Sequence, residues 1–197
     1  LELDKNRSLS KGELVTAYIK LQWEEYTVGV QDSNARLVLP GLRYSRNFYD
    51  NPTRPARGFH YGFDLRGTNQ LLGSDTEALQ LVSAGGVILP LPWRLSLRTR
   101  AKVGITLLSD PLSDLPPSLR FFAGGDQSVR GYSYQSLGPR DATGNVAGGK
   151  HLLAGSVELE RALFEDWGIS VFYDAGNAFD SFTAVRLFEG AGVGVHY

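Results

Sequence analysis

The sequence predicts an all-β fold, an antiparallel up-and-down transmembrane β-barrel of which these 197 residues supply about eight strands. First, apolar and polar side chains alternate with period two over runs of about 10–15 residues, longer than the roughly 5–6 residues of a globular strand. Second, 23 Gly, 10 Phe, 9 Tyr and 3 Trp favour sheet over helix. Third, the longest mostly apolar run, Ala84 to Trp93, is far shorter than the roughly 20 residues of a membrane helix, whereas a membrane strand needs about 9–11.

The first half of the chain contains four of the predicted strands. In the first of them, the odd positions from Val15 to Trp23 are apolar and most of the even positions between them are polar. In the third, the odd positions from Phe59 to Leu65 are apolar and face away from polar even positions. The second and fourth show weaker alternation. These four strands are predicted at residues 12–30, 35–48, 58–68 and 76–89.

The second half contains four more predicted strands, at residues 92–107, 150–164, 167–179 and 187–197. The first of these has the clearest pattern, because its odd positions are apolar apart from Thr99. Its even positions carry the cations Arg94, Arg98, Arg100 and Lys102. We expect these cations either to hold an acidic loop or substrate segment or to form a solvated pore wall. In the last strand, glycines alternate along one face and leave room for a loop packed inside the barrel: Gly190, Gly192 and Gly194.

Short predicted links join several neighbouring strands and indicate a meander. They lie at Asp32–Asn34, Pro90–Pro92 and Glu165–Asp166. Aromatic residues near the predicted strand ends are typical of the girdles of outer-membrane barrels. They are Trp23, Tyr26, Phe48, Tyr49, Phe59, Trp93, Phe164 and Trp167. The alternative is a soluble sandwich or lipocalin-like barrel with an apolar interior, which the long strands and the mixed charges of the polar faces disfavour.

Composition and residue spacing argue against several functional classes. The net charge of −1 lacks the basic excess of a nucleic-acid binder, and the absence of Cys excludes a disulfide scaffold, a zinc–thiolate site and a cysteine nucleophile. His60, His151 and His196 fall on different predicted strands without metal-ligand spacing. Glu158 and Glu160 share one strand face, which is more typical of lumen-facing acids than of a hydrolytic pair. We therefore expect no enzyme, no metal and no cofactor.

One connection, residues 108–149, shows no sustained alternation. Loops longer than about 12–15 residues without their own structure are usually functional or disordered. This one contains Gly124-Gly125 and the sequence Val129-Arg130-Gly131-Tyr132, where glycine permits the positive φ of tight turns. The residues alone allow two interpretations of this connection. It is either an ordered surface loop without a partner or a loop that takes part in the function of the barrel.

The residues of this connection resemble a known family. The run from Arg120 to Tyr132, followed by Gly138-Pro139 and Gly148-Gly149, is similar to the loop-six signature of the Omp85 superfamily, which are sixteen-stranded outer-membrane barrels with periplasmic POTRA domains. The tetrapeptide Val129-Arg130-Gly131-Tyr132 is the most diagnostic part. Phe172-Tyr173-Asp174-Ala175-Gly176 resembles the strand motif Phe-x-Asp-x-Gly of the same superfamily.

Within the superfamily the chain is most similar to the TamA-type members. The stretches that carry this resemblance are Leu119–Asp126, Leu39–Arg46 and Ala154–Glu158. The resemblance implies that residues 1–197 form part of a C-terminal Omp85-type β-barrel domain, comprising strands seven to fourteen of the sixteen, and that residues 108–149 form an extracellular-side loop that folds into the lumen. It places the POTRA domains and the last two strands outside the chain. Alone, the eight strands are expected to close into a small barrel or to pair their edges with another copy, with the loop displaced.

The resemblance also implies a function without catalysis. Omp85 proteins insert or secrete β-barrel proteins such as autotransporters through the bacterial outer membrane, so the expected partners are unfolded outer-membrane proteins, the lipid bilayer and a periplasmic TamB-like protein, with no nucleic acid. An incoming strand would be templated at an openable seam of the barrel. The alternatives are a passive porin-like pore and a polypeptide-secretion transporter of the two-partner type.

The resemblance places the arginine of the loop motif inside the barrel, against acids on the two following strands. The matching residues are Arg130, Glu158 and Asp174. The alternation independently puts Glu158 and Asp174 on the polar face, where two carboxylates on adjacent strands can reach one guanidinium. The predicted functional residues are therefore Val129, Arg130, Gly131 and Tyr132, with Glu158 and Asp174 as partners and Gly124, Gly125, Asp126, Phe172 and Gly176 as a supporting motif.

Overall fold

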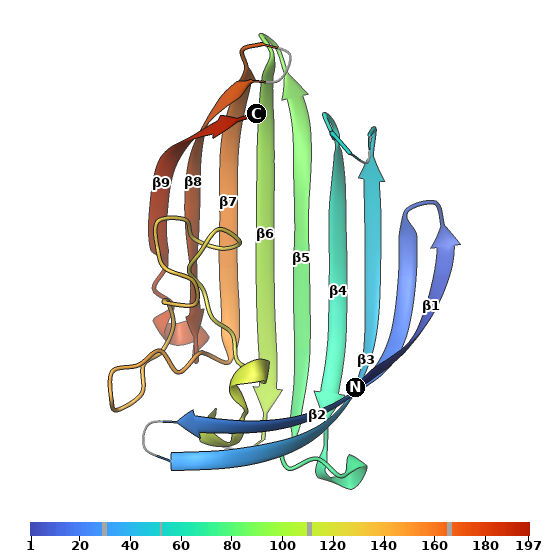
Figure 1. Ribbon diagram of the computed structural model, residues 1–197, viewed down its shortest axis with the longest axis vertical. Coiled ribbons are helices and arrows are strands. Elements are labelled where there is room, and N and C mark those ends of the chain that lie inside the picture. The colour runs from blue at the N-terminus through green and yellow to red at the C-terminus, as the bar shows by residue number, and fades with distance from the viewer. Residues whose placement is uncertain (29–30, 52, 110–111, 165–166) are drawn as a thin grey trace.

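The computed structural model describes residues 1–28, 31–51, 53–109, 112–164 and 167–197. It contains one nine-stranded antiparallel sheet in which each strand pairs with the next along the chain (Figure 1). The strands are β1 Glu2–Ser10, β2 Glu13–Val28, β3 Gln31–Tyr49, β4 Gly58–Thr68, β5 Ala78–Leu91, β6 Leu95–Leu108, β7 His151–Ala162, β8 Gly168–Phe179 and β9 Phe188–His196. Four short 3-10 helices lie in the connections: η1 Gln70–Leu72, η2 Leu112–Asp114, η3 Pro117–Leu119 and η4 Phe182–Ala184. None of the helices in the described residues is long and apolar enough to cross a membrane.

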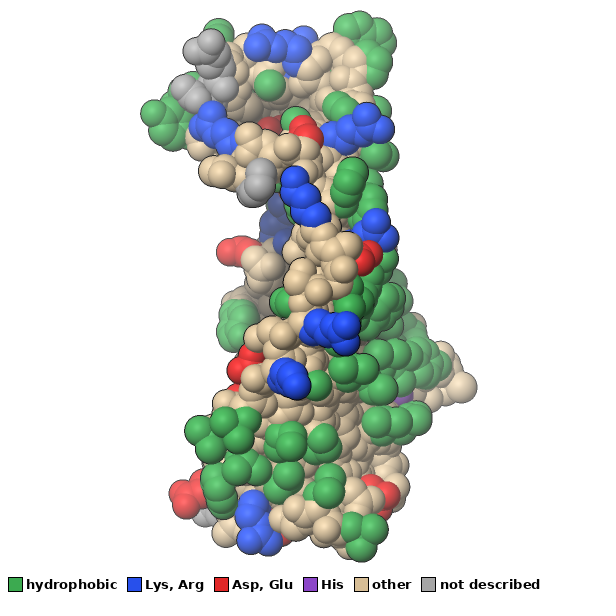
Figure 2. Space-filling model, turned by 90° about the vertical axis from the view of Figure 1, so that its right-hand side faces the viewer, with side chains coloured by type: hydrophobic (Ala, Val, Ile, Leu, Met, Phe, Trp, Pro, Cys, Tyr) green, Lys and Arg blue, Asp and Glu red, His purple; other side chains and the backbone are tan. Residues whose placement is uncertain are grey.

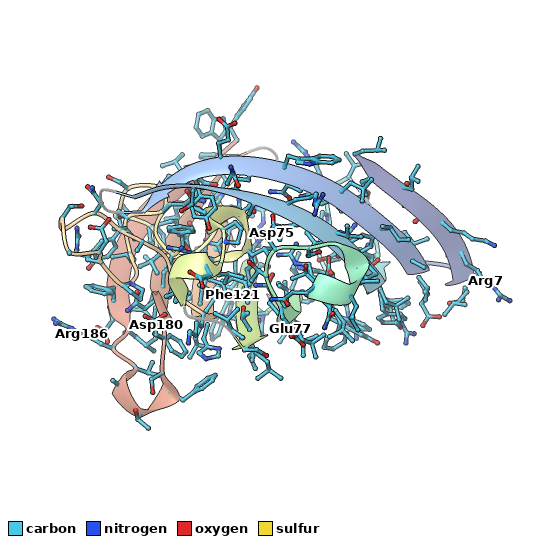
Figure 3. All side chains as sticks on the ribbon, turned by 90° about the horizontal axis from the view of Figure 1, so that it is seen from below. Arg7, Asp75, Glu77, Phe121, Asp180 and Arg186 are labelled. Atoms are coloured by element: carbon cyan, nitrogen blue, oxygen red, sulfur yellow. The ribbon has the colours of Figure 1, made fainter. Side chains whose placement is uncertain are left out.

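The sheet is a curved, open wall. Its two edges are β1 and β9, so the predicted closure of the chain into a small barrel is not what the structure shows. Viewed from below, β2 and β3 arch over the 3-10 helices of the long loop and over Phe121 (Figure 3). The loop therefore lies on the inner, concave side of the wall and is not displaced from it.

The strand boundaries differ from the predicted ones in three places. β1 was missed, because its residues are exposed throughout and their alternation is weak. The predicted turn at Asp32–Asn34 is wrong, since these residues belong to β3 and pair with Glu25–Thr27 of β2. The turn predicted at Pro90–Pro92 begins at Pro92, because β5 continues to Leu91, and Trp93 and Arg94 in this turn adopt positive φ angles of 62° and 60°. The turn predicted at Glu165–Asp166 lies outside the described residues.

The two faces of the wall follow the predicted alternation. Because paired residues in an antiparallel sheet share a face, one row of the register runs through Leu97, Leu159, Val171 and Val193 on the outer face. Val171 is 54% exposed and Val193 is 81% exposed there. Figure 2, seen from the β1 side, shows hydrophobic side chains gathered along one margin of the wall and across its lower part. In the neighbouring row, on the inner face, Arg98 pairs with Glu158, and both residues are polar. Of the predicted girdle, Trp23, Phe48, Trp93, Phe164 and Trp167 are exposed.

The base of the β6–β7 loop packs on the inner face through an apolar cluster. Leu115 and Leu119 of the loop contact Leu37 and Leu39 of β3 and Ala78 of β5, and all of these are buried. Fully burying a leucine side chain contributes about 1.5–3 kcal/mol. The inner face of β3 is therefore apolar where the loop covers it and polar elsewhere. This explains why the alternation of residues 35–48 is weak.

Candidate functional site

The loop tip is shaped by glycines that adopt positive φ. Gly124 and Gly125 have φ angles of 99° and 95°, and Gly131 has 90°, a region that other residues rarely adopt. Ser128 reinforces the turn, because its Oγ accepts a hydrogen bond from the Gly124 N–H at 2.8 Å. Val129 is fully buried in a second apolar cluster with Phe121 and Leu137 of the loop and with Leu152 and Ala178 of the wall. Its burial points the next residue, Arg130, at the inner face of β7 and β8.

Arg130 binds two carboxylates of the wall. Its Nε donates to Asp174 Oδ2 at 2.7 Å and its Nη2 to Asp174 Oδ1 at 2.9 Å, which is the bidentate geometry of a guanidinium–carboxylate pair. Its Nη1 donates to Glu158 Oε2 at 2.6 Å, and its Nη2 also donates to Ser156 Oγ at 3.0 Å. The Arg130 backbone N–H donates to Asp174 Oδ2 at 3.0 Å. The guanidinium carbon lies 3.4 Å from the centroid of the Phe172 ring. We call these five residues the Arg130 cluster.

The Arg130 cluster is largely shielded from solvent. The exposed fractions of the side chains are 21% for Arg130, 14% for Glu158 and 0% for Asp174. The hydrogen bonds to Asp174 raise the pKa of Arg130 above its usual value, while burial opposes them, so the guanidinium stays charged. Removing one partner of a buried pair costs about 3–5 kcal/mol, because a charge remains without compensation. The contact is therefore strong enough to fix the position of the loop.

Strand β9 makes room for the loop through its glycines, as expected from their alternation. A Cβ at Gly190 would lie 2.3 Å from the carbonyl oxygen of Arg130, and a Cβ at Gly192 would lie 2.6 Å from the Phe172 ring. Only glycine allows the loop backbone and this ring to approach β9 so closely. Tyr132 packs edge-on against Phe188 of β9, with 5.8 Å between ring centroids.

The remaining predicted residues lie outside the Arg130 cluster. Asp126 contributes its backbone, whose carbonyl accepts a hydrogen bond from Arg100 Nη2 at 2.6 Å. Gly176 allows close contact with β7, since a Cβ there would lie 2.9 Å from the Leu153 carbonyl oxygen. Of the predicted row of cations, Arg94 lies in a turn and Arg98 pairs with Glu160 at 2.8 Å. The structure thus brings Arg130, Glu158 and Asp174 together with Phe172, and leaves Asp126 and Gly176 outside the cluster.

Sequence reasoning missed Ser156, and it missed Ser170 and His196 next to the cluster. His196 Nε2 lies 3.2 Å from Glu158 Oε1 and 2.8 Å from Ser170 Oγ. The period-two spacing from Glu158 to Ser156 was the signal available for Ser156. The acid and the serine contact the same ring nitrogen of His196, whereas a catalytic triad needs the acid on Nδ1. The other histidines lie elsewhere, His60 beside Tyr49 and His151 beside Phe179 and Phe182.

Comparisons with known proteins agree with this architecture. A model of the Omp85 superfamily domain matches residues 6–196. The outer membrane protein assembly factor BamA of Nitratidesulfovibrio vulgaris (strain ATCC 29579 / DSM 644 / CCUG 34227 / NCIMB 8303 / VKM B-1760 / Hildenborough) is 26% identical over 143 residues, which are 71% of this chain and 18% of that protein. The crystal structure of BamA from Haemophilus ducreyi lacking POTRA domains 1–3 has a TM-score of 0.79 at 16% identity and is matched over 95% of this chain and 45% of its own.

The chain therefore spans less than half of each of these two proteins. The structural likeness, at 16% identity, shows a shared fold. The family match covers nearly the whole sequence. This chain belongs to the Omp85 superfamily.

Proposed function

We propose that this chain is the part of an outer-membrane barrel that holds the β6–β7 loop during the insertion or secretion of other β-barrel proteins. The protein is located in the bacterial outer membrane, as the other proteins of its family are. The observation that carries the proposal is the Arg130 cluster, in which a motif residue of a long loop is bound by two carboxylates on the inner face of the wall. A loop held in this way has a defined position inside the barrel, where it can contact a polypeptide during its assembly.

The finer assignment is to the TamA-type members. It rests on the stretches Leu119–Asp126, Leu39–Arg46 and Ala154–Glu158. In this proposal the substrates are unfolded outer-membrane proteins such as autotransporters, and the periplasmic partner is TamB-like. No chemical reaction is involved, and the function depends on binding and strand pairing. Co-purification of a TamB-like protein with the complete protein supports this assignment, and purification of the complete protein without one contradicts it.

The test replaces Arg130 in the complete protein, reconstituted in lipid vesicles with an unfolded outer-membrane protein as substrate. Arg130→Ala is expected to abolish most substrate folding while the barrel itself stays inserted. Arg130→Lys keeps the charge but loses the planar fork and is expected to be impaired as well. The matched control is Arg140→Ala, because Arg140 lies in the same loop, is exposed and donates to the carbonyl of Gly144.

A charge swap separates a specific contact from a general effect of charge. Arg130→Asp combined with Asp174→Arg is expected to recover part of the assembly that Arg130→Asp alone loses. Substrate folding is read from the shift in gel mobility between folded and unfolded barrels. Normal folding with Arg130→Ala, together with an unchanged protease pattern of the loop, would contradict the proposal. The porin-like alternative predicts that Arg130→Ala changes ion conductance and that no substrate folds with the wild-type protein.

A further inference from the structure

A second group of charges lies on the inner face, beside the loop tip and outside the Arg130 cluster. Arg100 and Lys102 of β6 line a cavity of about 320 Å³, together with His60 of β4 and with Gln127 and Ser128 of the loop. We call this cavity the cationic pocket. It is bounded by the wall on one side and by the loop tip on the other.

The register explains why this pocket is open and positively charged. On β7, Glu158 lies opposite Arg98, but Ser156 lies opposite Arg100 and Ala154 opposite Lys102. On the other side, β5 places Gly86 opposite Arg100 and Ala84 opposite Lys102. Both neighbouring strands therefore give these two cations small, uncharged neighbours. The small side chains on β5 and β7 leave space beside Arg100 and Lys102, and this space forms the cavity.

The two cations differ from others on the same face. Arg43 pairs with Asp64 at 2.9 Å, and Arg98 pairs with Glu160 at 2.8 Å. Within the described part of the chain, neither Arg100 nor Lys102 forms an ion pair, and Arg100 donates to the backbone carbonyl of Asp126. Two cations without a carboxylate in a partly enclosed cavity generate a positive potential that attracts anions.

We propose that the cationic pocket binds carboxylate side chains of an acidic segment of the polypeptide that the barrel handles. The proposal rests on the proposed function, since it assumes that a polypeptide enters the lumen. The pocket lies next to Gln127 and Ser128, three and two residues before Arg130, so a bound segment touches the tip of the loop that the Arg130 cluster holds. Charge complementarity of this kind adds specificity and speeds encounter, and its effect weakens with salt.

The binding test uses the complete protein in lipid vesicles and a fluorescent, end-blocked peptide with two adjacent glutamates. The same peptide with two glutamines is the neutral probe. Wild-type protein is expected to bind the glutamate peptide at least tenfold more tightly than the glutamine peptide, and high salt is expected to reduce the difference. Equal binding of the two peptides overturns the proposal.

Variants at Lys102 locate the binding. Lys102→Gln is expected to weaken binding of the glutamate peptide about tenfold, and Lys102→Glu to abolish it. Because Lys102 is exposed and has no partner in the described residues, neither change disturbs packing. Lys11→Gln, in the exposed β1–β2 turn, is the matched control and is expected to bind as wild type. Wild-type affinity in Lys102→Gln overturns the proposal.

Two further measurements complete the test. The first distinguishes binding of carboxylates from binding of phosphate. The second distinguishes failure of the proposal for the cationic pocket from failure of the proposed function. Inorganic phosphate at constant ionic strength is expected not to displace the glutamate peptide, and full displacement would instead assign the pocket to phosphate groups. Folding of an unfolded outer-membrane protein is measured in the same wild-type vesicles. Normal folding without charge-dependent peptide binding contradicts only the cationic pocket, whereas the absence of folding in the wild type contradicts the proposed function.

Discussion

The β6–β7 loop is attached to the wall at its base and at its tip. Apolar packing acts at both places, through Leu115 at the base and Val129 at the tip, but only the tip adds a charged, directed contact. At the base, Leu115 and Leu119 are buried against leucines of β3. At the tip, Arg130 is held by directed hydrogen bonds to Asp174 and Glu158. Burial of apolar area has no preferred direction, whereas a guanidinium fork requires its partners at fixed positions. The base therefore restrains the loop on the wall, and the tip sets its orientation.

The largest effect is expected from Arg130→Ala, which leaves Asp174 and Glu158 without their cation. The local free energy that holds the tip should fall by about 3–5 kcal/mol, because Asp174 is fully buried. Hydrogen exchange of the loop amides in the complete protein measures this as faster exchange near Val129 and Tyr132. The amides near Leu119 should be protected as before, and a loss of protection along the whole loop would contradict the separation of tip and base.

The complementary change is Leu115→Ala, which opens a cavity at the base. Leu115 is fully buried, so the cost is about 2–5 kcal/mol. Exchange should increase near Leu119 and Arg120, while the amides of the tip keep their protection. Leu71→Ala is the control, since Leu71 is 95% exposed and its truncation should change little. Equal effects of the two leucine changes would show that the base cluster does not hold the loop.

The sequence predicted the tip better than the base, for a physical reason. Glu158 and Asp174 lie on strands whose outer faces are apolar and whose inner faces are polar there, so the alternation alone identified their orientation. The base depends on Leu37 and Leu39, where β3 is apolar on the inner face and its period is blurred. Leu115 and Leu119 have no periodicity of their own, and nothing in the sequence indicates which strand they cover. Their contacts are set by the path of the loop, which is a property of the tertiary structure.

The strand boundaries, too, could be predicted where the alternation is clear and not where tertiary pairing decides the structure. Asp32–Asn34 is a sequence typical of a turn, yet these residues extend β3 because they pair with β2. The residues of β1 have no buried face, so no hydrophobic pattern marks them as a strand. If the β6–β7 loop is loop six of the family, the described strands β1–β9 correspond to strands six to fourteen instead of seven to fourteen.

A smaller loss of protection at the tip is expected when a side chain is added to the wall beneath it. Gly192→Ala adds a Cβ that would lie 2.6 Å from the Phe172 ring, so the ring must shift from beneath Arg130. Overpacking of this kind typically costs about 1–3 kcal/mol. Exchange at the tip should increase less than in Arg130→Ala. Gly155→Ala is the control, because within the described residues its Cβ would meet only the Arg100 carbonyl oxygen, at 3.8 Å. A tip as well protected as in the wild type would show that the stacking on Phe172 does not depend on Gly192.

The smallest effect is expected from Ser156→Ala, which removes one neutral hydroxyl of the wall that accepts from Arg130 and hydrogen-bonds Asp174. Ser156 Oγ accepts from Arg130 Nη2 at 3.0 Å, but the same nitrogen also donates to Asp174 Oδ1. A hydrogen bond of this kind contributes about 0.5–1.5 kcal/mol, and the remaining bonds keep the guanidinium in place. The decisive measurement is a double-mutant cycle with Arg130→Ala, read by exchange of the tip amides. In the Arg130→Ala background the Ser156→Ala change should have a smaller effect, because its bond to Arg130 is already gone and only its hydrogen bond to Asp174 remains. Additive effects would mean that Ser156 stabilises the wall independently of the loop, and that the directed contacts of the tip are those to Asp174 and Glu158.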